Sequence, residues 1–142
     1  SSPITLAASN GNFEGFKMLR QHGADPNDRG HNNTNCLIAA CNNNKNQDLI
    51  KYLLKECKIA IDVQDDDGYA AIHAVCKHGN LEILNILLDK GATVDVCTRE
   101  GYSPLMLAAM NSHRKIVKML LKEFTVSNPS PVYSILAQNL RS

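Results

Sequence analysis

What this sequence lacks excludes several classes of protein. Its 142 residues contain no Trp, aromatic side chains make up only 5%, and no long apolar stretch occurs. A helix that crosses a membrane needs about 20 consecutive apolar residues, so we expect neither membrane insertion nor a signal peptide. The formal net charge is +1 and no basic stripe is present, which disfavours nucleic acid as a partner.

The residue patterns of common catalytic and metal sites are missing as well. There is no glycine-rich phosphate loop, no Gly-x-Ser-x-Gly and no Cys/His set with zinc spacing. Asp65-Asp66-Asp67 lacks the distal Glu of a calcium loop, so we interpret these residues as turn formers. The five cysteines form no Cys-x-x-Cys pair, which is typical of reduced thiols in a cytoplasmic or nuclear protein. We therefore expect no enzyme, no cofactor and no metal.

One motif recurs along the chain and sets its organisation. It runs from Gly101 to Ala109, and the apolar run Ile116–Leu121 follows within a few residues. The positions equivalent to Leu105 are Ile4, Leu37 and Ile72, at successive spacings of 33, 35 and 33 residues. A period of this length is typical of stacked helix-turn-helix repeats. Such a stack needs few large rings, because each repeat buries its apolar face on its neighbours.

The repeated segments resemble a known family. Gly23-Ala24-Asp25-Pro26-Asn27 is similar to the Gly-Ala-Asp-Val-Asn segment of ankyrin repeats, and Ser103–Ala109 is similar to their Thr-Pro-Leu-His-x-Ala-Ala. The resemblance extends from Ser2 to about Phe124 and implies an all-α fold, an ankyrin-repeat solenoid with projecting β-hairpin-like loops. It implies units at about 1–29, 30–66, 67–99 and 100–124. We expect 125–142 to be a short linker and a C-terminal helix that forms a partial repeat or a cap. Because the chain begins at Ser1 without Met, we expect it to be part of a longer protein.

The second and fourth repeats depart from the family pattern. The 35-residue spacing predicts two single-residue insertions, one within Asn42–Asn46 and one at Cys57-Lys58, where Gly-Ala normally stands. Ser112 replaces the usual glycine of the turn between helices.

The cysteines and histidines receive mostly structural interpretations. Cys41 and Cys76 share one repeat position with Ala8 and Ala109, which predicts small buried residues. We expect Cys36, Cys57 and Cys97 to be partly exposed, and His78 and His113 to face solvent. His73 occupies the family's histidine position, so the resemblance implies hydrogen bonds to neighbouring loop backbone. A ligand or a pH-switch role is the alternative.

The resemblance also implies which side chains bind a partner. Residues at the variable offsets of the first helices and fingertip loops are His31, Asn32, Thr34, Asn42, Asn43, Asp66, Asp67, Tyr69, Lys77, His78, Arg99, Glu100, Tyr102, Met110 and Asn111. The first repeat adds only Ser9 and Asn10. Tyr and Arg are frequent interface anchors, which favours Tyr69, Tyr102 and Arg99. The alternative is that each tyrosine only packs on the next loop.

These observations predict a non-catalytic protein–protein interaction module. It would bind a segment or a folded domain of another protein through its concave face and fingertip loops, and would be a monomer by itself. The alternative is a regulatory domain of a larger enzyme, channel or transcription factor that acts on its own chain. Asn27 occupies the hairpin position that an oxygen-dependent dioxygenase hydroxylates in some ankyrin-like proteins, with Asp62 and Asp95 at the matching positions. The alternative role of Asn27 is to stabilise the hairpin.

Overall fold

The computed structural model describes residues 2–127, with side chains up to Phe124. Eight α-helices and one short 3-10 helix lie in this part of the chain: α1 (Pro3–Ser9), α2 (Phe13–Gln21), η1 (His31–Asn33), α3 (Cys36–Asn43), α4 (Gln47–Lys55), α5 (Ala71–His78), α6 (Leu81–Asp89), α7 (Pro104–Met110) and α8 (Arg114–Ser127). The α-helices form four pairs, one pair in each repeat.

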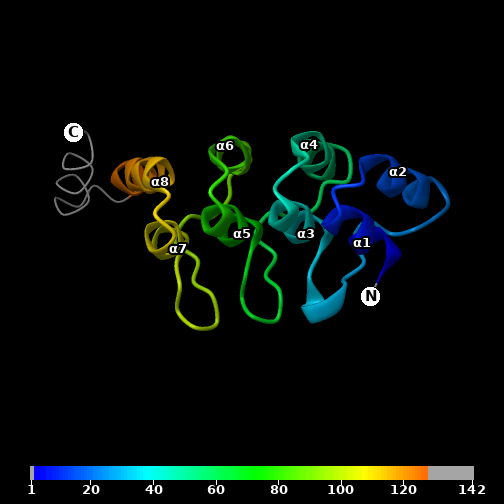
Figure 1. Cartoon of the computed structure of the whole chain (residues 1–142), viewed down its shortest axis with the longest axis horizontal. Helices are drawn as coiled ribbons and strands as arrows, with labels where there is room; N and C mark the ends of the chain where they lie inside the picture. The colour runs from blue at the N-terminus through cyan, green and yellow to red at the C-terminus, as the bar shows by residue number, and fades with distance from the viewer. Residues whose placement is uncertain (1, 128–142) are drawn as a thin grey trace.

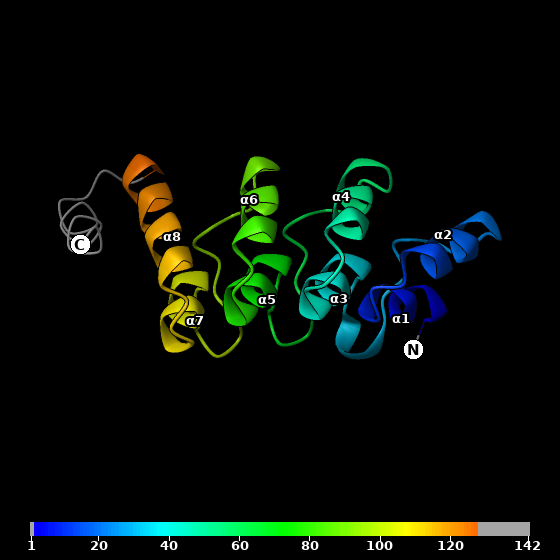
Figure 2. The same ribbon diagram turned by 45° about the horizontal axis from the view of Figure 1, so that its top comes forward.

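The helices lie in two rows. The first helices α1, α3, α5 and α7 form one row, in which each contacts the next, and the second helices form another row above it (Figures 1 and 2). The loops between units project from the row of first helices (Figure 1). No strand occurs within residues 2–127. The predicted all-α solenoid is confirmed.

The apolar anchors of the repeat form the core between the rows. Ile4, Leu37 and Ile72 are at most 1% exposed, whereas Leu105 in the last repeat is partly exposed. Ala8, Cys41 and Cys76 are fully buried as predicted, but Ala109 at the same position of the last repeat is exposed, so that prediction is wrong there. The prediction that Cys36 is partly exposed is wrong, because it lies in the first turn of α3 and faces the core at 0% exposure.

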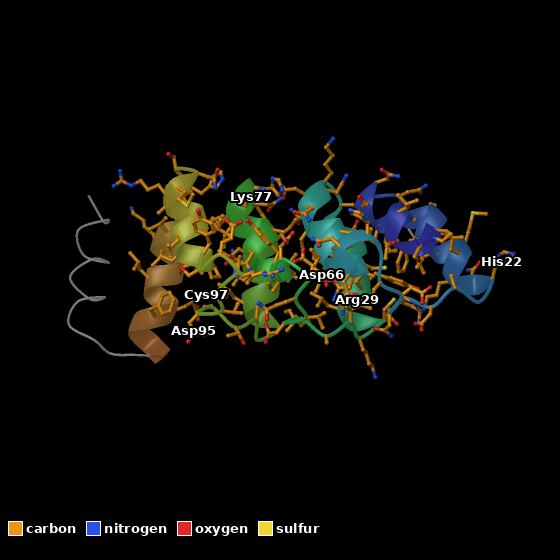
Figure 3. The ribbon with its side chains drawn as sticks, turned by 90° about the horizontal axis from the view of Figure 1, so that it is seen from below. His22, Arg29, Asp66, Lys77, Asp95 and Cys97 are labelled. Atoms are coloured by element: carbon orange, nitrogen blue, oxygen red, sulfur yellow. The ribbon has the colours of Figure 1, made fainter. Side chains whose placement is uncertain are left out.

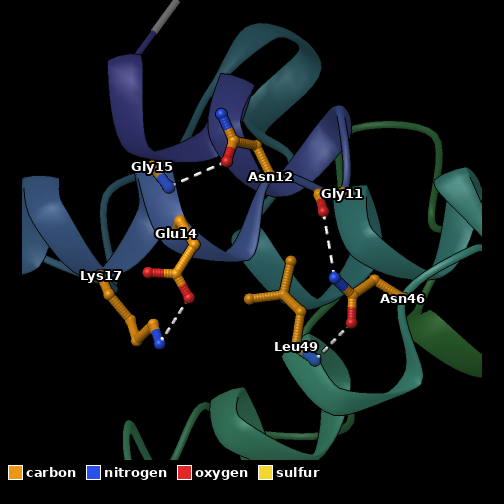
Figure 4. Close-up of polar contacts among 7 residues, drawn as sticks. All are labelled: Gly11, Asn12, Glu14, Gly15, Lys17, Asn46 and Leu49. Carbon is orange, nitrogen blue, oxygen red and sulfur yellow. Dashed lines mark hydrogen bonds and ion pairs between the residues drawn. The ribbon is translucent and has the colours of Figure 1, made fainter.

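Asparagine side chains begin the second helices of the first three repeats. Asn12, Asn46 and Asn80 each accept a hydrogen bond from the backbone N–H three residues later, at 2.9–3.0 Å. Such caps satisfy a backbone donor that has no partner within the helix and typically contribute about 1 kcal/mol. Asn46 also donates to the carbonyl of Gly11 at 3.1 Å, which ties the second repeat to the first (Figure 4).

The turn between the two helices of each repeat needs a left-handed residue, and three residue types fill it. Gly11 and Gly79 have φ of +67° and +88°, while Asn44 and Ser112 take φ of +64° and +60° at the same place. In the second repeat, Lys45 separates this residue from the helix cap, so the first predicted insertion is confirmed.

The second insertion follows α4, but its register differs from the prediction by one residue. In the first repeat, the Ala24 N–H bonds to the carbonyl of Leu19, five residues back. In the second repeat the equivalent bond joins Ile59 to Leu53, six residues back. Lys58-Ile59, not Cys57-Lys58, therefore stands where Gly-Ala is usual, and Lys58 adopts φ +52° in place of glycine.

The two ends of the stack differ from its middle. Large apolar side chains are exposed in the first repeat, at Leu6 and Met18, and in the fourth, at Met106 and Met110. Helix α8 continues to Ser127, past the point at Phe124 where we expected a linker to begin. The predicted partial repeat or cap within 128–142 lies outside the described residues.

Candidate functional site

The three loops between units are closed in the same way. One backbone hydrogen bond links Gly30 to Thr34, another Asp65 to Tyr69 and a third Thr98 to Tyr102, at 2.7–2.9 Å. Side chains reinforce two of the loops: Asp65 Oδ1 accepts from the Tyr69 N–H and Thr98 Oγ1 from the Tyr102 N–H. Each loop is thus a short hairpin-like finger held in one shape.

Neighbouring fingers are joined through their backbones. The N–H of Asp66 donates to the carbonyl of Asn32 at 3.0 Å, and the N–H of Arg99 donates to the carbonyl of Asp67 at 2.9 Å. These two bonds occupy equivalent repeat positions. The side chain of Asn32 also donates to Asp67 Oδ2 at 2.7 Å. The fingers therefore form a connected row rather than independent loops.

Arg29 and Gln64 add a second set of links at one repeat position. Arg29 donates to Asn33 O in its own loop and to Gln64 O in the next. Gln64 repeats the pattern, donating to Gly68 O at 2.8 Å and to Cys97 O at 3.2 Å. Figure 3 shows Arg29, Asp66 and Cys97 from the loop side of the stack. We did not predict these links from the sequence, although Arg29 and Gln64 are long hydrogen-bond donors at one repeat position, 35 residues apart, and could have indicated them.

His73 fixes the base of the third finger. Its Nδ1 accepts from the Ala70 N–H at 2.9 Å, so Nε2 carries the proton and donates to the Val96 carbonyl at 2.8 Å. Burial lowers the pKa of the imidazole, which is 0% exposed. The predicted bond to neighbouring loop backbone is confirmed, and the ring also supports Tyr69, whose centroid lies 5.7 Å away.

His113 has a role that the sequence did not reveal. We expected it to face solvent, but it is half-buried and its Nε2 lies 2.9 Å from the Lys77 carbonyl. A Cβ on Gly79 would meet the His113 ring at 2.4 Å, so the imidazole packs on that turn. His113 therefore joins the third and fourth repeats, whereas His78 is exposed as predicted.

None of the predicted partner-binding residues is buried. The exposed ones are His31, Asn42, Asp66, Asp67, Lys77, His78, Arg99, Glu100, Met110 and Asn111, and the partly exposed ones are Asn32, Thr34, Asn43, Tyr69 and Tyr102. Five of them meet in one charged groove of about 350 Å³, which Asp67, Tyr69, Lys77, Thr98, Arg99 and Glu100 line. The Lys77 ammonium lies 5.9 Å from the centroid of the Tyr69 ring.

A second groove lies at the equivalent place two repeats earlier. This neutral groove has a volume of about 210 Å³ and is lined by Thr5, Leu6, Ser9, His31, Thr34, Ala39 and Asn42. Leu6 is 50% exposed there. The sequence had suggested Ser9, His31, Thr34 and Asn42 for this face, but not Thr5 or Leu6. The remaining candidates line neither groove, and Asn111 donates to Leu107 O of its own helix.

Asn27 and its two equivalents differ in their contacts. Asn27 is exposed, and its backbone N–H donates to Asp25 Oδ1 at 2.9 Å. Asp62 accepts both the backbone N–H and the hydroxyl of Thr93, at 2.9 and 2.7 Å, and so links the second and third repeats. Asp95 is exposed.

Neither a metal site nor a membrane-spanning helix occurs in the described part of the chain. Residues 2–127 contain no group of three or more His, Cys, Asp or Glu side chains placed to hold a metal ion. Within the same range, every helix is too short or too polar to cross a membrane.

The rows of paired helices and linked fingers define a repeat solenoid of the helix-turn-helix class. A family model described as ankyrin repeats (3 copies) matches residues 37–129, and a second, ankyrin repeats (many copies), matches residues 4–54. The chain belongs to the ankyrin-repeat family.

Its curated relatives are much longer proteins. The chain is 29% identical over 130 residues to mouse serine/threonine-protein kinase TNNI3K, covering 84% of this chain and 16% of the kinase. It is 29% identical over 122 residues to human transient receptor potential cation channel subfamily A member 1, covering 86% of this chain and 11% of the channel. Human BCL-6 corepressor-like protein 1 matches over 75 residues at 33% identity, 53% of this chain and 4% of that protein. The chain thus spans less than a fifth of the length of these relatives.

Proposed function

We propose that this chain is a non-catalytic module that binds another protein through its concave face and fingers. The observation that supports this most directly is the row of linked fingers, which carries exposed polar side chains and two partly exposed tyrosines on a fixed base. Side chains that are already held in place lose little conformational entropy when a partner binds, so more of the contact energy appears as affinity. A cytoplasmic or nuclear location and a monomeric state are part of the same proposal.

Affinity capture from cell extract, quantified by mass spectrometry, tests the proposal. The double variant Tyr69→Ala/Tyr102→Ala removes two partly exposed rings from neighbouring fingers. The control Lys51→Ala/Lys55→Ala changes two exposed residues on α4 in the second row. We expect a set of proteins that wild type and control recover and the tyrosine variant loses, with all three equally folded by circular dichroism. Equal recovery by all three would place the binding surface elsewhere.

A second candidate is a regulatory domain that acts on its own longer chain. The observation that favours it is the small share of the kinase and of the channel that this chain matches. In this case the partner is another part of the same polypeptide. The purified chain would then bind the separately expressed remainder of its parent protein, and the tyrosine variant would weaken that binding.

Hydroxylation of Asn27 is a further proposal, and its exposure is the observation that supports it. Intact-mass and peptide analysis of protein isolated from cells would show one added oxygen on the Asn27 peptide. An unmodified peptide from oxygenated cells would refute it.

A further inference from the structure

The two grooves occupy the same position of the repeat but differ in chemistry. Ser9 of the neutral groove is equivalent to Lys77 of the charged groove, and His31 is equivalent to Arg99. The neutral groove has no Asp, Glu, Lys or Arg in its lining and contains the half-exposed side chain of Leu6. The surface formed by the first helices and fingers therefore offers an apolar contact near its N-terminal end and a charged one two repeats further on.

The charged groove favours a cation. Asp67 and Glu100 line it, and Asp65 lies beneath it, since its Oδ1 accepts from the Tyr69 N–H. Only Lys77 and Arg99 in the lining oppose these three carboxylates. The groove already holds a cation, because the Lys77 ammonium sits over the Tyr69 ring. An ammonium or guanidinium is attracted both to the face of an aromatic ring and to neighbouring carboxylates.

The distance between the grooves follows from the stacking of the repeats. Packed helices lie about 8–10 Å apart, so two repeat steps separate the grooves by about 20 Å. An extended peptide advances about 3.3 Å per residue and covers this distance in about six residues. A single extended segment can therefore reach both grooves.

We propose that the partner presents an extended segment in which an apolar residue and a Lys or Arg stand about six positions apart. The apolar side chain lies against Leu6 in the neutral groove. The basic side chain enters the charged groove between Tyr69 and Glu100, where it takes the place of the Lys77 ammonium. This inference rests on the proposed protein-binding function and adds the chemistry of the partner.

Selection from a phage-displayed library of random 12-residue peptides on the purified chain tests the proposal. The enriched peptides should share an apolar residue and a Lys or Arg about six positions apart, in either chain direction. Enrichment of acidic peptides, of peptides without this spacing, or of none would overturn it.

Fluorescence anisotropy with one selected peptide then assigns the two contacts. Glu100→Gln should weaken binding by up to about fivefold, the range of a single exposed ion pair, and the matched change Glu82→Gln on α6 should have no effect. Lys77→Met should strengthen binding, because the peptide's cation no longer competes with the protein's own. Leu6→Ser should weaken binding by about threefold or more through lost apolar contact. Equal affinities for all four variants would refute the assignment.

Taken together, the extract capture and the peptide selection distinguish failure of the extended-segment proposal from failure of the proposed protein-binding function. If extract proteins are lost with the Tyr69→Ala/Tyr102→Ala variant but no peptide is selected, the binding face stands and the extended-segment inference falls. If the tyrosine variant changes nothing and no peptide is selected, both fail.

Discussion

Gly68 provides the sharpest test of the linked fingers. Its φ is +81°, a conformation that costs most L-residues about 1–2 kcal/mol. A Cβ at this position would lie 2.5 Å from the backbone nitrogen of Arg99 and 3.0 Å from the carbonyl carbon of Thr98. Because these are backbone atoms of the next finger, they can move away only if the hydrogen bond from the Arg99 N–H to Asp67 O is disturbed. Loss of such a bond costs about another 1 kcal/mol.

Gly101 is the matched control one repeat later. Its φ of +90° is similar, but a Cβ added there would meet no atom of the described chain within 4 Å. We expect Gly101→Ala to lower the free energy of unfolding by about 1–2 kcal/mol through backbone strain alone. Gly68→Ala should lower it by at least about 1 kcal/mol more, because it adds the disturbed contact between fingers.

Urea denaturation followed by circular dichroism measures both losses, and thermal melts check them. For a chain of this size, a difference of 1 kcal/mol corresponds to about 4 °C in Tm. Equal losses for the two variants would refute the reasoning. Backbone strain would then account for the whole loss in the free energy of unfolding, and the contact between fingers would contribute none of it. A larger loss for Gly101→Ala would refute it more strongly.

Three further predictions concern single contacts. Burial lowers the pKa of His73 below its ordinary 6.5, so below pH 6.5 the unfolded chain binds more protons than the folded chain. The free energy of unfolding should therefore be highest above pH 6.5 and decline as the pH falls. The His73→Gln variant should show a weaker decline in the same unfolding measurements. Burial raises the pKa of the Cys41 thiol to about 12, so iodoacetamide should label the exposed Cys97 of the folded chain long before it labels Cys41. Peptide mass spectrometry measures the two labelling rates, and equal rates would contradict the described core. Asp62→Ala removes both exposed bonds from Thr93 and should lower the free energy of unfolding by about 1 kcal/mol in urea titrations. Asp95→Ala, at the equivalent and likewise exposed position, should change it little.

The repeat pattern predicted the backbone of this chain well. The spacing of Ile4, Leu37 and Ile72 gave the helix pairs and the position of the core, because each repeat must bury the same apolar positions on its neighbour. The family position of His73 gave its bond to the next loop correctly. These features occur at equivalent positions of successive repeats, so the repeat pattern is enough to predict them.

Features that depend on the conformation of an individual residue could not be predicted from the repeat pattern. Lys58 takes a left-handed conformation that its residue type does not suggest, and the register there was wrong by one position. The links made by Arg29 and Gln64 depend on the rotamers of long side chains and on the path of the following loop. The sequence placed Asp67 beside Arg99 and Glu100, but it did not predict that they line one groove, because the groove forms where two fingers lie together.

The two extra residues of the second repeat have a consequence for engineering this chain. Lys45 lies in the turn between helices, and the other insertion lies between Leu53 and Ile59, so neither falls within the tip of a finger. The loop from Asp65 to Tyr69 still closes with the same backbone bond as the loop from Thr98 to Tyr102. Length has thus been added at these points while the shape of the fingers is unchanged. A fluorescent label on the exposed side chain of Lys58 should therefore report on the molecule without altering the fingers, whereas Lys45 lies three residues from Asn42 of the neutral groove.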